Sequence, residues 1–260
     1  MLSPYTPRFV DIPTLIAVTV ILILGSTLQG AAGFGFGMFA IPLLILLGCK
    51  PFEAIVFASI GAGVQSIIGT WVLRRHVRWA QCLAMIVLAA GMIPIGILVL
   101  ERIDGLEPSR VRQIFGAIIL AALLVQLLAR IEPRERLHPA WMLLAMPCSG
   151  FMSGLAGMGG PPAVLWVMAH RWSGERSRAT LWVLFAALTP LQVVFLYRRF
   201  GDGVLDAARI GAILAPLTLL GVGAGLWIGG RIPKRRLRHL SYVILFLVSM
   251  YAILQPMWAG

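Results

Sequence analysis

Charged residues are scarce in this chain. They make up 12% of its 260 residues, and the acidic kind is rarer still, with 10 Asp and Glu against 22 Lys and Arg. Soluble domains carry about 25% charged residues, so this composition excludes an ordinary soluble domain. Cysteine is scarce too: Cys49, Cys82 and Cys148 show no metal or redox spacing, and we expect them to be small core residues.

Ionisable side chains are missing from the middle of the long apolar runs. Ion pumps and proton relays usually place such groups at membrane depth, so the sequence names no proton carrier and leaves any proton coupling open. Glu53 and His170 come nearest, and a solvated helix end is the favoured interpretation of each.

Apolar residues, in contrast, make up 59% of the chain, and the mean hydropathy is +0.90. Nearly every stretch between charge clusters reaches the roughly 20 residues that a helix needs to cross hydrocarbon. The runs are apolar all round and lack strand alternation, so an all-α polytopic transmembrane bundle is favoured over an outer-membrane barrel. The net charge of +12 sits in short clusters between these runs, where it would anchor helices and meet anionic lipid, and no nucleic acid is expected.

Short basic connections divide the chain into apolar segments, and the first is expected to remain in the mature protein because no cleavable signal peptide is evident. The ten segments are 12–31, 35–49, 52–73, 80–100, 112–130, 140–156, 160–170, 179–197, 207–230 and 239–257.

The two halves of the chain resemble each other. An offset of 124 residues superimposes the following glycines and alanines: Gly30, Ala32, Gly33 and Gly35 on Gly154, Ala156, Gly157 and Gly159. The same offset places Arg74-Arg75 on Arg198-Arg199, and a slightly changed one places Arg110-Val-Arg112 on Arg236-Leu-Arg238. Three matches in the same order predict a duplication, with one repeat in 1–133 and the other in 134–260 of a single membrane domain.

The number of crossings predicts that the repeats are inverted. Residues 12–49 would form a helix of about 57 Å, which is too long for one crossing, so it must break or fold back as a re-entrant hairpin. Five crossings per half, or three with re-entrant hairpins, is an odd number, and the second half would then be inverted. Of the 22 Lys and Arg, 8 lie on one side and 14 on the other, which places the richer side in the cytoplasm and both termini outside. A single broken crossing per half gives 10 and 12 instead, so the bias is modest.

Each half contains a Gly-rich interruption, Gln29–Gly37 and Ser153–Pro162, inside a membrane-length run. Broken helices survive in hydrocarbon only where they are buried in protein or line a cavity, and paired breaks indicate a transporter's binding site. Pro161 and Pro162 predict a helix start, whose free N–H groups and dipole would bind an anion near the membrane centre. The other helix is expected to start near Gly35 or Gly37. The alternative is that the glycines serve close helix packing alone.

Neutral side chains near the breaks complete the predicted site. They could hold anionic oxygens in a dry cavity, although interhelical hydrogen bonding is an equal alternative for each. The predicted substrate-binding residues are Gln29, Gly33, Gly35, Gly37, Gln65, Ser153, Gly157, Gly159, Gly160 and Thr189, with Ser26 and Ser149 nearby. We expect no metal and no cofactor.

Two motifs that suggest enzymes are discounted. The glycines of 33–37 resemble part of a dinucleotide loop, but no βαβ unit surrounds them. Ser153-Gly154 is similar to an intramembrane serine protease motif, but the four histidines, at 76, 138, 170 and 239, all lie at segment ends, so no base is in reach. We therefore do not expect an enzyme.

The paired glycine motifs resemble those of the sulfite exporter TauE/SafE family of membrane proteins. The resemblance rests on Gly30-Ala-Ala-Gly-Phe-Gly-Phe-Gly37 with Pro42, on Gly150-Phe-Met-Ser-Gly-Leu-Ala-Gly-Met-Gly-Gly-Pro-Pro162, and on the Arg-x-Arg openings of the last segments, and it covers about residues 12 to 257. Phe36 stands where a glycine is common in the family, so equal roles for the two loops do not follow. The resemblance implies a transporter of small anions, such as sulfite, organosulfonates and related sulfur-containing acids.

The sequence thus predicts an integral plasma membrane protein, of the bacterial inner membrane, that moves a small sulfur-containing or carboxylic anion by alternating access. A passive anion channel and a non-transporting scaffold subunit are the alternatives. A homodimer is compatible with the sequence, which does not test it.

Overall fold

The computed structural model of the chain describes residues 12–32, 35–129, 132–135, 137–229, 231 and 234–258. Within these ranges the chain forms helices joined by short connections, with no β-strand and one isolated β-bridge between Arg134 and His170. The predicted all-α fold is confirmed for this part of the chain.

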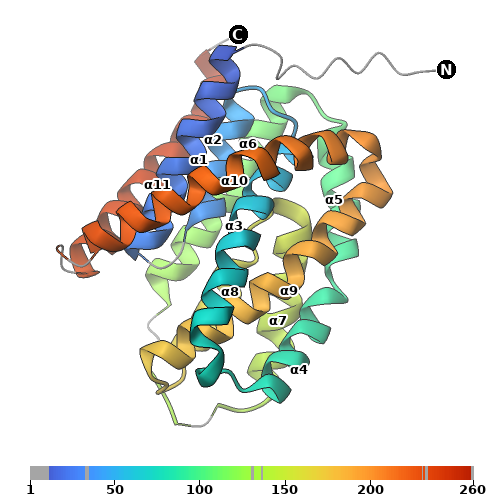
Figure 1. Cartoon of the computed structure of the whole chain (residues 1–260). Coiled ribbons are helices and arrows are strands. Elements are labelled where there is room, and N and C mark those ends of the chain that lie inside the picture. The colour runs from blue at the N-terminus through green and yellow to red at the C-terminus, as the bar shows by residue number, and fades with distance from the viewer. Residues whose placement is uncertain are drawn as a thin grey trace.

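Every predicted apolar segment contains a helix (Figure 1). The helices are α1 (Ile12–Ala32), α2 (Phe36–Leu46), α3 (Pro51–Leu73), the 3-10 turn η2 (Arg74–His76), α4 (Trp79–Ala90), α5 (Ile93–Asp104), α6 (Pro108–Leu128), α7 (Ala140–Ala156), α8 (Gly160–Met168), α9 (Gly174–Phe200), α10 (Asp202–Gly229) and α11 (Lys234–Trp258). The segment predicted as 80–100 is divided into α4 and α5, because Pro94 lacks an N–H group and lies in the first turn of the new helix.

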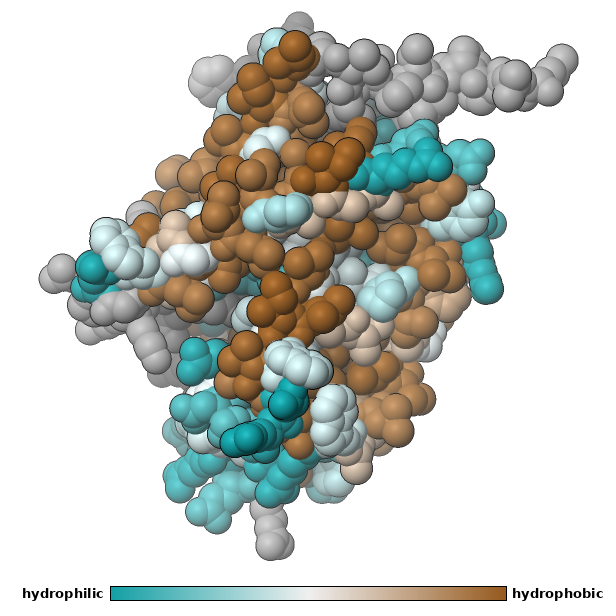
Figure 2. Space-filling model, in the orientation of Figure 1, coloured by the Kyte–Doolittle hydropathy of each residue, from teal (hydrophilic) through white to brown (hydrophobic). Residues whose placement is uncertain are grey.

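The helices are long and apolar enough to make this an integral membrane protein. Six candidate spans lie at Ile12–Ala31, Pro51–His76, Trp79–Asp104, Pro108–Leu128, Gly174–Phe200 and Asp202–Ile228. Large apolar side chains cover the middle of the molecule, and hydrophilic residues gather at its ends (Figure 2). Leu128 and Ile213 are 76% and 75% exposed, which in water would be costly and in lipid is favourable.

One prediction about cysteine is wrong. Cys49 and Cys82 are buried as expected, but Cys148 is exposed on α7, the helix on which Leu143 and Leu144 are also exposed. A thiol within an apolar run can face either the core or the lipid, because hydrocarbon tolerates it as well as a protein core does.

The helix order and the helix contacts recur in the two halves. The helix starts at 160, 174, 202 and 234 lie 123 to 126 residues after those at 36, 51, 79 and 108. Helix α1 packs on α10, and its counterpart α7 packs on α4 and α5, while α3 packs on α9 and α6 on α11. A duplicated unit would produce this pattern; the repeat boundary at 133 and 134 stays a prediction.

Two of the matched glycines serve close helix packing. An ideal Cβ on Gly30 would lie 2.5 Å from the carbonyl oxygen of Val222, so α1 and α10 cross backbone to backbone. A Cβ on Gly154 would collide in the same way with the carbonyl oxygen of Ile93, where α7 crosses α5. The packing interpretation therefore holds for this pair of glycines, while Gly35 and Gly157 lie at the breaks themselves.

Candidate functional site

Both Gly-rich motifs break a helix. Each break contains a position whose backbone conformation only glycine adopts readily. Gly35, directly before α2, has φ +104°, and Gly157, directly after α7, has φ +65°. Residues with a Cβ rarely adopt this left-handed backbone. The predicted helix starts are confirmed, because α2 begins at Phe36 and α8 begins at Gly160.

The two breaks lie against each other. An ideal Cβ on Gly37 would stand 3.0 Å from the carbonyl oxygen of Gly157, although 120 residues separate the two along the chain. A larger residue at either place would force the breaks apart, since Gly157 also faces Ile41 and Ile55. The fold thus brings the paired motifs to one place.

A cavity of about 130 Å³ opens where the breaks meet. Its wall consists of both breaks and of one face each of α3 and α9, with Gln126 from α6. The lining residues from the breaks are Gln29, Gly35, Phe36, Gly37 and Met38 on one side and Ser153, Gly157, Met158, Gly159, Gly160 and Pro161 on the other. A cavity of this size suits a small molecule of a few heavy atoms and not a cofactor such as a dinucleotide.

The cavity receives the N-terminal ends of two helices. The first residues of α2 and of α8 both line it, and the first N–H groups of a helix have no partner within that helix. Pro161 and Pro162 lack N–H groups, so at α8 the donors are those of Gly159, Gly160 and Ala163. Two helix dipoles and their free donors give the cavity a positive potential that favours an anion.

The predicted site residues are largely brought together. Eight of the ten line the cavity: Gln29, Gly35, Gly37, Ser153, Gly157, Gly159, Gly160 and Thr189. Gly33 lies outside the described residues. Gln65 is buried but is not among the lining residues, whereas its neighbour Ser66 is, because successive residues on a helix point about 100° apart.

The second break is fixed by hydrogen bonds from neutral side chains. Ser149 Oγ donates to the carbonyl oxygen of Gly159 at 2.5 Å, and Gln192 Nε2 donates to the carbonyl oxygen of Ser153 at 2.8 Å. A Cβ on Gly159 would collide with Ser153 Oγ. The Ser149 bond pairs a main-chain carbonyl at the break, and the Gln192 bond adds a second donor to the Ser153 carbonyl, which already accepts the N–H of Gly157.

The sequence analysis missed several polar lining residues, and their spacing could have revealed them. Gln192 and Ser59 are buried, and their side chains form a 3.4 Å hydrogen bond between α9 and α3. The α9 lining residues follow a helical stripe: Arg178, Leu181, Trp182, Phe185, Leu188, Thr189 and Gln192. Continuing that stripe from Thr189 by three residues gives Gln192.

Arg178 is the charged side chain in this lining, among the residues that the structure describes. Arg178 lies directly before the predicted apolar segment 179–197, but α9 begins five residues earlier than that segment, at Gly174. Ser173 caps that helix, since its Oγ accepts the N–H of Arg176 at 3.3 Å. Among the described residues no cluster of three or more potential metal ligands exists.

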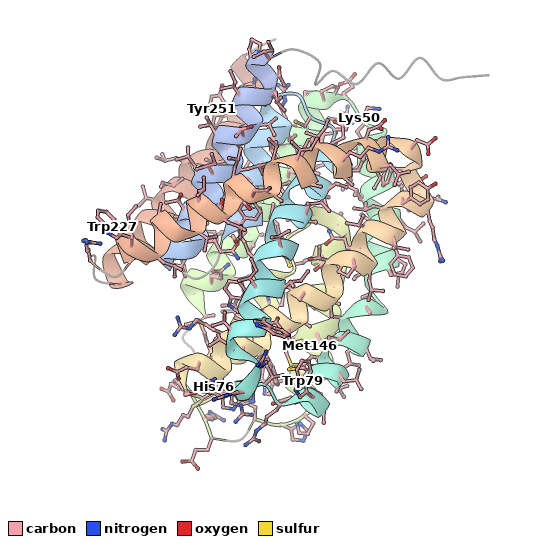
Figure 3. The ribbon with its side chains drawn as sticks, in the orientation of Figure 1. Lys50, His76, Trp79, Met146, Trp227 and Tyr251 are labelled. Atoms are coloured by element: carbon pink, nitrogen blue, oxygen red, sulfur yellow. The ribbon has the colours of Figure 1, made fainter. Side chains whose placement is uncertain are left out.

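The cavity reaches one end of the bundle, and aromatic and charged contacts join the halves at the other. The start of α9, with Arg178, packs near η2, where α3 has ended. At the other end of α9, Phe200 stacks on Phe52 of α3 with ring centroids 4.8 Å apart, and Arg199 pairs with Glu101 of α5. Helices α3 and α9 are therefore antiparallel; Figure 3 labels Lys50 and His76 at the two ends of α3.

The chain has relatives among known proteins. The family model described as "Sulfite exporter TauE/SafE" matches residues 17–252. A curated relative from Cupriavidus necator, named "Probable sulfite/organosulfonate exporter TauE", is 24% identical over 212 residues, which are 79% of this chain and 80% of the relative. No solved structure matches the chain significantly. Because the family model spans nearly the whole chain, the protein belongs to the sulfite exporter TauE/SafE family of membrane transporters.

Proposed function

We propose that this protein is a secondary transporter that exports small anions across the plasma membrane, the inner membrane of a bacterium. The substrates would be sulfite, organosulfonates or related sulfur-containing or carboxylic acids. The observation that carries the proposal is the cavity in which the N-terminal ends of α2 and α8 meet. The relative's name and the family support the substrate class.

The substrate would be held by donors of the main chain and of neutral side chains. An oxyanion accepts several N–H and O–H bonds at once, and hydrogen bonds to a charged acceptor are about twice as strong as neutral ones. The N–H groups at the starts of α2 and α8 would supply some of these bonds, with Gln29, Ser153 and Thr189 completing the shell. Aromatic rings of the lining would accept the organic part of a sulfonate.

Alternating access would come from movement of one inverted repeat against the other. Helices α3 and α9, which the duplication makes equivalent, run antiparallel, as inverted repeats require. The Phe52–Phe200 stack and the Arg199–Glu101 pair join the halves at one end, while the cavity reaches the other end. That end carries Arg74, Arg75 and Arg178, which the predicted orientation places in the cytoplasm, so an exporter would load its substrate there.

Purified protein in proteoliposomes tests the proposal. Labelled sulfite, methanesulfonate and acetate are offered side by side, and we expect saturable uptake of sulfite, sulfonate or both. Gly159→Leu should abolish uptake, because its side chain would fill the space of Ser153 Oγ at the cavity wall. Gly223→Leu is the matched control, since nothing lies within 4 Å of a Cβ at that exposed position of α10.

The same experiment tests the scaffold alternative and the role of the cavity. Assembly of both variants is checked by size-exclusion chromatography, so that a misfolded protein is not mistaken for an inactive one. A scaffold subunit would move none of the three anions in its wild-type form. Full uptake by a well-folded Gly159→Leu variant would show that the cavity is not the site.

A further inference from the structure

Arg178 stands at the entrance of the cavity. It lies in the second turn of α9 and is exposed, whereas the lining deeper along the same stripe is neutral, with Thr189 and then the buried Gln192. An anion that enters from this end would meet the guanidinium group before it reaches the helix N-termini. The position is thus suited to collecting anions from solution.

The guanidinium group of Arg178 interacts electrostatically with the exposed Glu175 and still has N–H donors available for a ligand. Its Nε donates to the carbonyl oxygen of Gly174 at 3.3 Å within the helix. The ion pairs among the described residues join Arg199 to Glu101 and Arg209 to Asp206, so none engages Arg178. A planar guanidinium group has further donors in a fork that matches the oxygens of a sulfonate, sulfite or carboxylate group.

Trp182 stands beside Arg178, one turn further into the cavity. Its ring lies directly against Gly69 of α3, where even a Cβ would collide with it. The indole therefore extends from α9 to α3 and forms an apolar wall of the lining. The entrance combines a cation with a flat aromatic surface, which suits an anionic group and the carbon chain attached to it.

We propose that Arg178 and Trp182 form an entry subsite that binds the anionic group of the substrate before it passes to the helix N-termini. The inference rests on the proposed function, and it adds a charged, specificity-determining residue to a site that is otherwise neutral. Arg178 would raise the local concentration of anions and would discriminate against uncharged molecules of the same size.

Uptake of labelled sulfite into proteoliposomes, measured at low and at high ionic strength, tests this subsite. Arg178→Gln should raise the half-saturating concentration about tenfold at low salt. The difference from wild type should shrink in about 1 M sodium chloride, because salt screens the exposed charge. Arg178→Lys should retain most of the wild-type affinity, since it keeps the charge.

Arg75→Gln is the matched control, since it removes an exposed arginine from η2 at the same end without touching the cavity lining. It should leave the half-saturating concentration near that of wild type. Equal half-saturating concentrations for Arg178→Gln and wild type at low salt would overturn the subsite, as would an equal change in Arg75→Gln. A wild-type protein that moves no anion would overturn the proposed function itself, and the subsite with it.

Discussion

At the scale of single residues, neutral side chains do two things at once around the second break. Ser149 donates to the carbonyl of Gly159, Gln192 adds a second donor to the carbonyl of Ser153, and Ser153 and Gln192 also line the cavity. In a membrane an unpaired main-chain group costs roughly several kcal/mol of folding free energy. These hydrogen bonds therefore stabilise the fold as well as the site. The two interpretations of such residues, binding and structure, are therefore not exclusive.

Gln192→Leu tests this double role. The change removes one of two donors to the Ser153 carbonyl, which keeps the N–H of Gly157, and it removes the acceptor of the buried Ser59 hydroxyl. It should cost about 1–3 kcal/mol, while sulfite transport falls at least about tenfold. Thermal unfolding in detergent and uptake in proteoliposomes measure the two effects. Thr19→Val is the control, because that hydroxyl bonds only to Leu15 within its own helix. Unchanged stability and transport in Gln192→Leu would contradict the double role.

For Gln65 we expect the opposite of Gln192: its replacement should impair neither stability nor transport. Its amide atoms are buried and have no hydrogen-bond partner among the residues that the structure describes, and its side chain is not part of the cavity lining. Removing a buried, unpaired polar group is neutral or stabilising, so Gln65→Met should raise the melting temperature or leave it unchanged, with transport retained. Loss of transport in a stable Gln65→Met protein would indicate that this residue belongs to the binding site, as predicted from the sequence alone.

At the scale of the elements, the site is made from two helix starts and the backbone that precedes them. The positive φ of Gly35 and Gly157 turns the chain so that the N-terminal ends of α2 and α8 both line the cavity. This backbone arrangement supplies positive potential without placing a charged side chain deep in the membrane, where it would be costly.

Gly157→Ala tests the role of this backbone. The methyl group would strain the left-handed backbone by about 1–2 kcal/mol and would also press on Ile41, so transport should be lost. Gly48→Ala is the control: Gly48 has φ +100°, but nothing lies within 4 Å of its Cβ position. Both variants should lose similar stability through strain, and only Gly157→Ala should lose transport. Equal transport by the two would contradict the role given to the break.

The helices could be predicted from the sequence because lipid imposes length and apolarity on each of them. The start of α8 was predictable from Pro161 and Pro162, whose chemistry is local. The exposure of Cys148, the place of Arg178 and the turning of Gln65 away from the cavity were not. They depend on which face of a helix meets lipid, cavity or protein, and composition does not fix that face in a membrane.

At the scale of the whole molecule, the first helix of each half packs on helices of the other half. Helix α1 of the first half packs on α10 of the second, and α7 of the second packs on α4 and α5 of the first. The glycines that allow these crossings, Gly30 and Gly154, belong to the same motifs as the breaks. Movement of one half against the other would therefore move both walls of the cavity together.

Alternating access requires that this cavity bind an anion and face the two sides of the membrane in turn. Counterflow of labelled sulfite tests it most directly: proteoliposomes loaded with excess unlabelled sulfite are diluted into a trace of label. A transporter should accumulate label transiently above its equilibrium level, because the unlabelled anion competes for the return path. Uptake that rises to equilibrium without such an overshoot would indicate a passive pore and would contradict the account.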